Sequence, residues 1–405
     1  MTKSKATPVV IVLALLTLAG IGVWVYQLMN GLAVTGMNNG NSWGLYIGCF
    51  MFFVGLSAGG LIVASSASVF GVKDFKKVAK PAVLLSTVCI IAAAAFILID
   101  LGSVQRVFNL ILHPNFTSPL MWDVVVITLY LIINIVYLVL LRRPDKEQNE
   151  RALAVTSRFA LPVAILVHSV TAWIFGLQVA KVGWYSAIMA PLFVSSALNS
   201  GLALLLVVLV LLNKTRIFET SKKLMTSLAG LLAVCIAVDA FMVFCEILTM
   251  AYPGAAQEGF ILTQLTTGAT APYFWFHIIG GLVIPFLLLV FSRLREKTSV
   301  VVLASLLAVL GVFCKRMWLL LTTFIEQNIS GAPGVSYGRS SLEGTDIWAL
   351  AGSYAPTWVE VCIVIGVISL AALIYVVVAG RLFSDSPKKS ASAEALPEAA
   401  QGEMA

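Results

Sequence analysis

Ten long apolar runs dominate the sequence and leave few folds open to it. A helix needs roughly 20 consecutive apolar residues to cross the hydrocarbon core of a bilayer. Lipid offers the backbone no hydrogen-bond partners, so each crossing segment has to be helical. The pattern therefore predicts an all-α, polytopic membrane protein with ten transmembrane helices. The predicted spans are residues 9–29, 43–70, 81–101, 121–141, 159–179, 191–212, 224–251, 271–291, 299–322 and 357–382.

Composition excludes a substantial soluble domain. Hydrophobic residues make up 60% of the chain and charged residues 11%, whereas an ordinary soluble domain is about half apolar and about one quarter charged. Lys3 and Lys5 precede the first apolar run, as they would in a signal peptide. That run is long and no small-residue cleavage site follows it, so we expect it to be retained as the first span.

Positive charge is distributed unevenly between the two sides of the predicted bundle. The chain has a formal net charge of +7, and most of its 26 Lys and Arg residues fall at the N-terminus, in every second loop and after the last span. The positive-inside rule makes these segments cytoplasmic. We expect ten spans in a bacterial inner (cytoplasmic) membrane with both termini in the cytoplasm. Because the basic charge follows topology, we expect no nucleic-acid partner.

Ionisable residues inside the predicted spans gather in the outer half of the membrane, with His168 and Asp239 nearer the middle. Charged side chains are costly in lipid and mark sites or pathways by default. All nine tryptophans fall in the outer half or in outer loops, although aromatic belts normally form at both interfaces. We therefore expect a functional site in the outer half. The other ionisable residues in this set are Asp100, Asp123, Glu246, His277, Lys315, Arg316 and Glu360.

Cysteine and histidine usage argues against a metal centre in this chain. The six cysteines lie in apolar spans and show no Cys-x-x-Cys spacing, so we expect no iron–sulfur cluster bound by the chain itself. Of the three histidines, only His168 and His277 fall in spans, and nothing in their spacing favours a bis-histidine haem. We expect no metal ligands among these residues.

Three spans open with a similar pattern. The stretches SPLMWDV, APYFWFH and APTWVEV each place a proline, a tryptophan and then an ionisable residue: Asp123, His277 and Glu360. Proline suits the first helical turn, and a carboxylate there meets the positive end of the helix dipole. This placement, beside water and the dipole, is our first explanation for how Asp123 is tolerated.

The similarity extends into an internal repeat. Asp100 and Glu246 each come near the end of the span before such an opening, and His168 is echoed four spans later by Lys315 and Arg316. The pattern predicts two related four-helix bundles with a flanking helix at each end. The predicted divisions are 1–42 (first helix and outer loop), 43–180 and 181–325 (the two bundles), 326–383 (outer loop and tenth helix) and 384–405 (a disordered cytoplasmic tail).

Four stretches carry a family resemblance: NSWGLYIGCFMFFVGLSAGG, IDLGSVQRVFN, SPLMWDVVVITLY and LVHSVTAWIFGLQVAKVGWYSAIMAPLFVSSALNSG. Together they resemble the NrfD / polysulfide-reductase family of membrane subunits, in particular its ten-helix branch, as in alternative complex III and some hydrogenases. The likeness covers the second to sixth spans. It continues more loosely through CEIL, CKRMW and APTWVE.

The resemblance implies a function. Such subunits carry no haem or iron–sulfur cluster, bind a quinone (menaquinone or ubiquinone) near the outer face, and exchange electrons with a ferredoxin-like iron–sulfur subunit docked there. That partner is joined in turn to a molybdopterin or other catalytic subunit. We accordingly expect a quinone-reactive membrane anchor of an oxidoreductase complex, not catalytic alone. Its quinone site is expected within 43–180, and its partner over the outer loops 102–118 and 326–354.

The resemblance also implies roles for particular residues. It places Asp123 and Asp100 beside the quinone, although family members often have histidine where this chain has Asp100, and His168 resembles the histidine of the family's fifth span. Quinol oxidation releases two protons, so it needs bases within hydrogen-bond reach; these three are the candidates. Arg106 is a candidate to hold an anion. The other expected quinone-binding residues are Trp122, Tyr46, Ser169 and Gln178.

Two alternatives remain open. The first is a secondary transporter, a class in which internal repeats and ionisable residues near the membrane midplane, such as Asp239, are common. A redox assay would distinguish a transporter from a quinone-reactive subunit. A proton-translocating redox module would instead use the outer-half charges of the second bundle, and proton-to-electron stoichiometry would reveal it. If those charges are structural, Glu246 and Glu360 would balance Lys315 and Arg316. The residues assigned to this path or cluster are Asp239, Glu246, His277, Lys315, Arg316 and Glu360.

Overall fold

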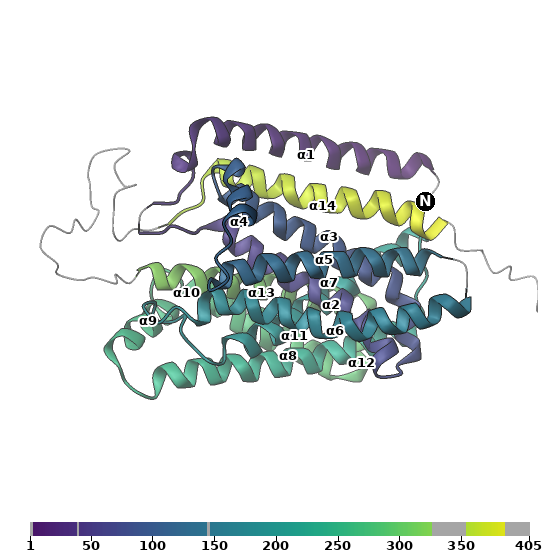
Figure 1. The fold of residues 1–405 in the computed structure, drawn as a ribbon. Helices are drawn as coiled ribbons and strands as arrows, with labels where there is room; N and C mark the ends of the chain where they lie inside the picture. Colours follow the sequence, from purple (N-terminus) through teal and green to yellow (C-terminus); the bar gives the residue numbers. More distant parts are fainter. Residues whose placement is uncertain (1–2, 39, 144–145, 326–353, 385–405) are drawn as a thin grey trace, which may run out of the picture.

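The computed structural model describes residues 3–38, 40–143, 146–325 and 354–384. Within these ranges it contains ten helices long and apolar enough to cross a membrane, and no strand. The prediction of an all-α, ten-span membrane protein is therefore confirmed (Figure 1). Most of the predicted outer loop at 326–354 and the tail after Ser384 lie outside the described residues.

Nine of the spans are single helices, and one is built from three segments. The single helices are α1 (Lys3–Asn30), α2 (Leu45–Val69), α3 (Ala79–Asp100), α5 (Pro119–Arg142), α6 (Lys146–Gly176), α7 (Met189–Thr215), α8 (Lys222–Ala251), α13 (Thr298–Ile325) and α14 (Trp358–Ser384). The composite span joins α10 (Ala271–Trp275), η4 (Phe276–Val283) and α11 (Ile284–Val290). The connections hold η1 (Leu32–Val34), η2 (Lys73–Val78), η3 (Val104–Phe108), α4 (Asn109–Leu112), α9 (Ala256–Thr266) and α12 (Ser292–Arg295).

The composite span was not predicted from the sequence. Its middle segment, η4, is a π-helix, a rare geometry that recurs at functional sites. Gly281 of η4 meets Gly311 of α13 so closely that a Cβ on Gly281 would lie 2.5 Å from the Gly311 Cα atom. Because neither residue has a side chain, the irregular segment packs directly against a regular helix. The same segment carries His277.

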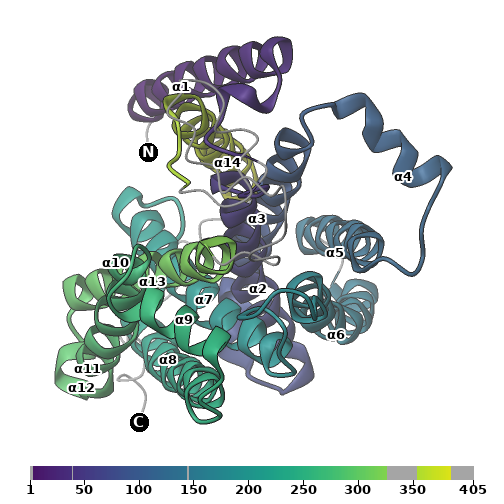
Figure 2. The same cartoon turned by 90° about the vertical axis from the view of Figure 1, so that its left-hand side faces the viewer.

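Helix α2 occupies the centre of the bundle. In its apolar span 89% of residues are buried, against 11% in α1 and 22% in α14, so the first and last helices are peripheral. Figure 2 shows α3, α5 and α6 on one side of α2, and α8, α10, α11 and α13 grouped on the other, beyond α7. Helices α1 and α14 pack against each other, and α14 also packs against α3. The division into two related four-helix units stays a prediction.

Two glycines join the halves of the bundle. A Cβ added to Gly59 of α2 would lie 2.1 Å from the carbonyl carbon of Gly201 in α7, and one added to Gly201 would lie 2.4 Å from the Gly59 nitrogen. Small residues allow membrane helices to approach this closely, which increases van der Waals contact where no hydrophobic force drives association. The small residues of α2 at this crossing therefore serve close helix packing.

Substituting Gly59 tests this crossing. We expect Gly59→Ala to lower the melting temperature and the yield of folded protein, because the two backbones would have to separate at a cost of about 1–3 kcal/mol. Gly22→Ala in α1 is the matched control, since nothing lies within 4 Å of a Cβ there. Thermal unfolding of the two variants in detergent is the measurement. Equal melting temperatures would contradict the importance of the crossing.

Candidate functional site

Asp123 lies deeper than its sequence position predicts. Helix α5 already begins at Pro119, so Asp123 stands in the second turn, and only 2% of it is exposed. Its Oδ1 accepts a hydrogen bond of 2.6 Å from the Thr171 hydroxyl of α6. The explanation from first-turn placement beside water is therefore wrong. Asp123 is tolerated because it is enclosed between two helices and hydrogen-bonded by a neutral donor.

His168 links α6 to α2. Its Nδ1 lies 2.6 Å from the Ala164 carbonyl oxygen of its own helix, and its Nε2 lies 3.1 Å from the Val54 carbonyl oxygen of α2. Both neighbours can only accept, whereas a neutral imidazole has a single N–H. A neutral ring therefore donates to one of the two carbonyls at a time, and only a protonated ring would satisfy both contacts. Thr171 follows three residues later, on the adjacent turn of α6.

A second group of polar residues lies at the ends of α1, α2 and α3. The buried Tyr46 hydroxyl donates to Gln27 Oε1 at 2.6 Å, and Gln27 Nε2 donates to the Ile99 carbonyl at 3.2 Å. Asp100 follows Ile99 at the last position of α3. Its Oδ1 is buried and has no hydrogen-bond partner among the described residues. Asp100 and Tyr46 are close enough to interact electrostatically, so the structure brings these two predicted site residues together.

Glu360 caps the last helix. Its Oε2 accepts from the backbone nitrogens of Thr357 at 3.0 Å and Gly36 at 2.8 Å, and its Oε1 accepts from the Tyr354 hydroxyl at 2.5 Å. Glu360 thus makes one half of a capping box at the start of α14, while the Thr357 hydroxyl donates to the Val34 carbonyl at 3.0 Å. Burial, together with the Glu360 carboxylate, holds the pKa of the Tyr354 phenol above its usual range, so this group remains a donor at neutral pH.

Four charged residues form a separate, fully enclosed charge cluster: Asp239, Glu246, Lys315 and Arg316. Lys315 pairs directly with Glu246. Asp239 accepts from Asn199 Nδ2 at 2.9 Å and from the Ser195 hydroxyl at 3.3 Å, and both cations act on it electrostatically. Two cations and two anions leave the cluster formally neutral. Asp239 is therefore the second balancing acid; the prediction that Glu360 has this place is wrong, because Glu360 caps α14 instead.

The charge cluster contains donors without protein partners. Arg316 donates one hydrogen bond of 2.5 Å, to the Ser196 hydroxyl, and its guanidinium lies 3.7 Å from the Phe193 ring centroid. Its Nε and Nη1 are buried without a partner among the described residues, as are both ring nitrogens of His277. Such atoms mark places where ordered water can bind.

His168 and Arg316 contact α2 and α7 at equal sequence distances from the Gly59–Gly201 crossing. Val54 comes five residues before Gly59, and Ser196 comes five residues before Gly201. His168 of α6 contacts Val54, and Arg316 of α13 contacts Ser196. Since Gly59 and Gly201 mark the crossing of α2 and α7, each half places one basic side chain on the same turn beside it.

Four predicted quinone-binding residues join neither the residues around Asp123 and His168 nor the Tyr46–Asp100 group. Arg106 is exposed in η3, and Gln178 is exposed just after α6. Trp122 donates from Nε1 to the Phe116 carbonyl at 2.6 Å, so it stabilises the preceding loop. The Ser169 hydroxyl bonds the Ile165 carbonyl of its own helix at 3.0 Å. Their assignment stays a prediction without a contact to support it.

A crevice between α1, α3 and α14 lies beside the Tyr46–Asp100 group. It has a volume of about 290 Å³ and is lined by apolar side chains together with Thr17 and Trp24. Ile99 lines it directly before Asp100. The Trp24 indole nitrogen is buried and has no partner among the described residues. The sequence placed Trp24 only in the outer aromatic set, and nothing in its spacing marked it as a site residue.

Polar residues that the predictions missed come mainly from α7. Ser195, Ser196 and Asn199 hydrogen-bond to Asp239 or Arg316. The polar residues in the stretch VSSALNS lie within an apolar span, and this pattern indicates buried polar contacts. Within the described ranges no cluster of three or more His, Cys, Asp or Glu residues could hold a metal ion.

The sequence profile of the family described as "Polysulphide reductase, NrfD" matches residues 33–326. The chain belongs to this family. It is 40% identical to a Halobacterium salinarum protein provisionally named as a dimethyl sulfoxide reductase membrane subunit, over 90% of this chain and 88% of the relative. It is 30% identical to the Hdr-like menaquinol oxidoreductase integral membrane subunit of Archaeoglobus fulgidus, over 94% of both chains. It is 24% identical to a selenate reductase subunit of Mesobacillus selenatarsenatis, over 90% of this chain and 91% of the relative.

The charge cluster predicts a strong effect of Asp239→Asn. The substitution leaves two buried cations with one carboxylate, and breaking a buried ionic group costs about 3–5 kcal/mol. We expect a large loss of folded protein, partly restored when Arg316→Gln is added. Asp74→Asn is the control, because Asp74 pairs with Lys77 in an exposed contact and exposed pairs contribute about 0–1 kcal/mol. Normal yield and melting temperature for Asp239→Asn would contradict the interpretation.

Proposed function

We propose that this chain is the quinone-reactive membrane anchor of a multi-subunit iron–sulfur oxidoreductase. Family membership supports the proposal, and so do the names of the relatives, which describe subunits of dimethyl sulfoxide, menaquinol and selenate oxidoreductases. The chain passes electrons between the quinone pool and an iron–sulfur subunit on the outer face, which is joined to a molybdopterin-type catalytic subunit. The complex resides in the cell membrane, with both termini of this chain cytoplasmic.

The observation that carries the proposal is the crevice between α1, α3 and α14. Its volume of about 290 Å³ is at the lower end of the roughly 300–1,000 Å³ of small-molecule sites. Such sites are mostly apolar with a few placed polar groups. Here the candidate groups lie at its border: Trp24, a lining residue, has a buried, unpaired indole N–H, and Asp100, with an unpaired oxygen, follows the lining residue Ile99. A quinone ring accepts from a donor, and a quinol hydroxyl donates to an acceptor.

Different residues of the chain bind the ring, accept a proton and position the end of α3 at this crevice. A bound quinone or quinol supplies two-electron, two-proton chemistry. Trp24 orients a ring oxygen through its indole N–H, and Asp100 accepts a proton at Oδ1. Gln27 and Tyr46 fix the carbonyl of Ile99 and so hold the end of α3. Asp100 is the last residue of α3, next to exposed Leu101, so its proton has a short route to the outer aqueous side.

Asp123 is the candidate for the second proton. It is enclosed between α5 and α6 and is held by Thr171, one turn from His168, whose two carbonyl contacts suit a protonated ring. None of these residues lines the crevice, so in this proposal they receive the second proton by relay and not directly from the quinol.

A proton-translocating module is the second candidate. The charge cluster with its unpaired Arg316 and His277 nitrogens favours it, because buried charges and water sites can relay protons. The π-helical segment η4 places His277 next to this cluster, with its ring centroid 6.2 Å from that of Trp318. Proton-to-electron stoichiometry in vesicles distinguishes this candidate from quinone chemistry alone.

Replacing the two carboxylates tests the quinone proposal. We expect Asp100→Asn to lower quinol oxidation roughly 100-fold or more, the usual contribution of a positioned base, and Asp123→Asn to lower it strongly. Asparagine keeps the size and polarity of each site, so the complex should still assemble. Asp74→Asn serves as the control. The measurement is quinol oxidation by the purified complex, and wild-type turnover in both variants would reject the proton roles.

Trp24→Phe separates binding from proton transfer in the same assay. Phenylalanine keeps an aromatic ring in the crevice but removes the N–H donor. We expect a KM for quinol raised roughly tenfold with kcat largely kept, as for loss of one hydrogen bond of about 1.4 kcal/mol. Trp275→Phe is the matched control, because its N–H bonds the Thr266 carbonyl at 2.9 Å and it is not a predicted site residue. An unchanged KM in Trp24→Phe would show that the quinone does not bind beside Trp24 in this crevice.

The connection between α3 and α5 is our candidate docking surface for the iron–sulfur subunit. It arches away from the bundle (Figure 2) and carries exposed apolar side chains, with Ile111 74% and Phe116 68% exposed. We expect a photo-reactive amino acid in place of Ile111 to cross-link to the partner in membranes, and one in place of Lys222, at the opposite end of the helices, to give no such product. Arg339, in the other predicted outer loop, lies outside the described residues. The reverse result would overturn the predicted orientation.

A further inference from the structure

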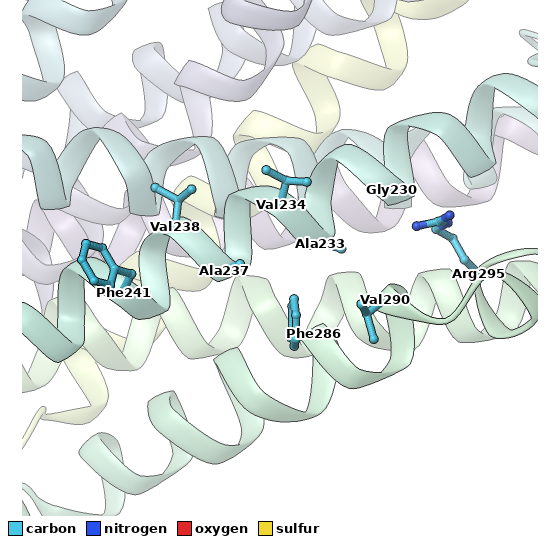
Figure 3. A pocket seen from close by; sticks show the side chains of 9 residues that line it. All are labelled: Gly230, Ala233, Val234, Ala237, Val238, Phe241, Phe286, Val290 and Arg295. Atoms are coloured by element: carbon cyan, nitrogen blue, oxygen red, sulfur yellow. The ribbon is translucent and has the colours of Figure 1, made fainter.

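A groove runs along the lipid-facing side of α8, away from the crevice and the charge cluster. Gly230, Ala233 and Ala237 of α8 form its floor, Phe286 and Val290 of α11 form one wall, and its volume is about 430 Å³. Figure 3 shows Phe241 at one end of the groove and Arg295 at the other. Apart from Arg295, every side chain that lines the groove is apolar.

Arg295 closes the end that lies on the Lys- and Arg-rich side of the protein. Its Nη1 donates to the Leu289 carbonyl at 3.2 Å, a bond to the end of α11 that fixes the guanidinium in place. The guanidinium lies over Gly230, where an added Cβ would be 3.2 Å from Nη1. Its Nε is buried without a partner, and no carboxylate pairs with Arg295 among the described residues.

The length of the groove identifies its occupant. From Gly230 to Phe241, α8 rises about 16 Å at 1.5 Å per residue, which is roughly half of the ~30 Å hydrocarbon core. A partner helix would need the full thickness, whereas an acyl chain of one leaflet needs half. An acyl chain also fits a lining of small and apolar residues.

The charge around the groove identifies the headgroup. Four exposed cations lie in the segments that form its closed end: Lys222 and Lys223 begin α8, two turns before Gly230, and Arg293 and Lys297 flank Arg295. Two acids are near them: Glu296 lies between Arg295 and Lys297, and Asp74 interacts electrostatically with Lys223. A guanidinium matches a phosphate in bidentate geometry, and surrounding cations favour a headgroup with net negative charge.

We propose that this groove is a binding site for one anionic phospholipid of the leaflet on the Lys- and Arg-rich side. The phosphate lies on Arg295, and one acyl chain lies between α8 and α11 as far as Phe241. The lipid stabilises the otherwise open contact of α8 with the composite span, and so supports the helix that carries Asp239 and Glu246.

Lipid titration of the full-length protein, read by native mass spectrometry, tests the site. The probes are phosphatidylglycerol and phosphatidylcholine with the same acyl chains. We expect Arg295→Gln to weaken phosphatidylglycerol binding roughly tenfold, for the loss of a bidentate charged contact. Arg293→Gln, an exposed neighbour, should change it less than about twofold, as expected of a screened surface charge.

A second pair of variants tests the acyl-chain groove and does not depend on Arg295. Val238→Trp fills the groove and should also weaken binding roughly tenfold, the effect of obstructing a few buried methylene groups. Val136→Trp on α5 is the matched control, since Val238 is 45% exposed and Val136 44% exposed. Both are lipid-facing, so both variants should fold.

Four results would overturn the proposal. Equal binding of phosphatidylcholine, or an equal loss of binding in Arg293→Gln, would indicate that there is no specific headgroup site. Full competition by inorganic phosphate, with no effect of Val238→Trp, would indicate a site for free phosphate. Displacement of the lipid by a quinone at equal concentration would indicate that the groove binds quinone.

Discussion

The crossing of α2 and α7 at Gly59 and Gly201 determines where every other helix can lie. The two backbones touch there, and α2 is almost wholly enclosed as a result. Helix α6 reaches the crossing through His168, and α13 reaches it through Arg316. In a membrane, polar contacts of this kind and close packing hold helices together, because lipid is as apolar as their side chains.

The buried polar groups fall into distinct sets with distinct physical tasks. The charge cluster is neutral within itself, so the low dielectric around it penalises no net charge. Asp123 relies on one hydroxyl donor, and Glu360 is satisfied by three groups, Gly36, Thr357 and Tyr354. Asp100 and Trp24 retain unpaired atoms beside the crevice, and Arg316 retains them inside the charge cluster. Groups whose partners are all supplied by the protein stabilise the fold, whereas unpaired ones beside a crevice are available to a ligand.

Much of the fold could be predicted from sequence, because each span is long, apolar and bounded by charges. The depth of a residue along its helix follows from counting, so the similar depth of Glu246 and Lys315, which pair with each other, could be predicted. Lateral neighbours could not, because hydropathy does not say which helices touch. This is why Glu360 was grouped with Lys315 and Arg316, although the Thr-x-x-Glu pattern of a capping box was present in APTWVEV. The π-helical segment and the unpaired Trp24 leave no pattern in the sequence.

The crevice between α1, α3 and α14 takes its walls from both ends of the chain. Gly20 of α1 and Gly366 of α14 meet so closely that a Cβ on either would lie 2.6 Å from the other's Cα atom. Glu360 then binds the loop after α1 through the Gly36 nitrogen. During synthesis, α1, α2 and α3 enter the membrane long before α14 exists. The third wall is therefore added last, so a chain that stalls before its tenth helix has no enclosed crevice.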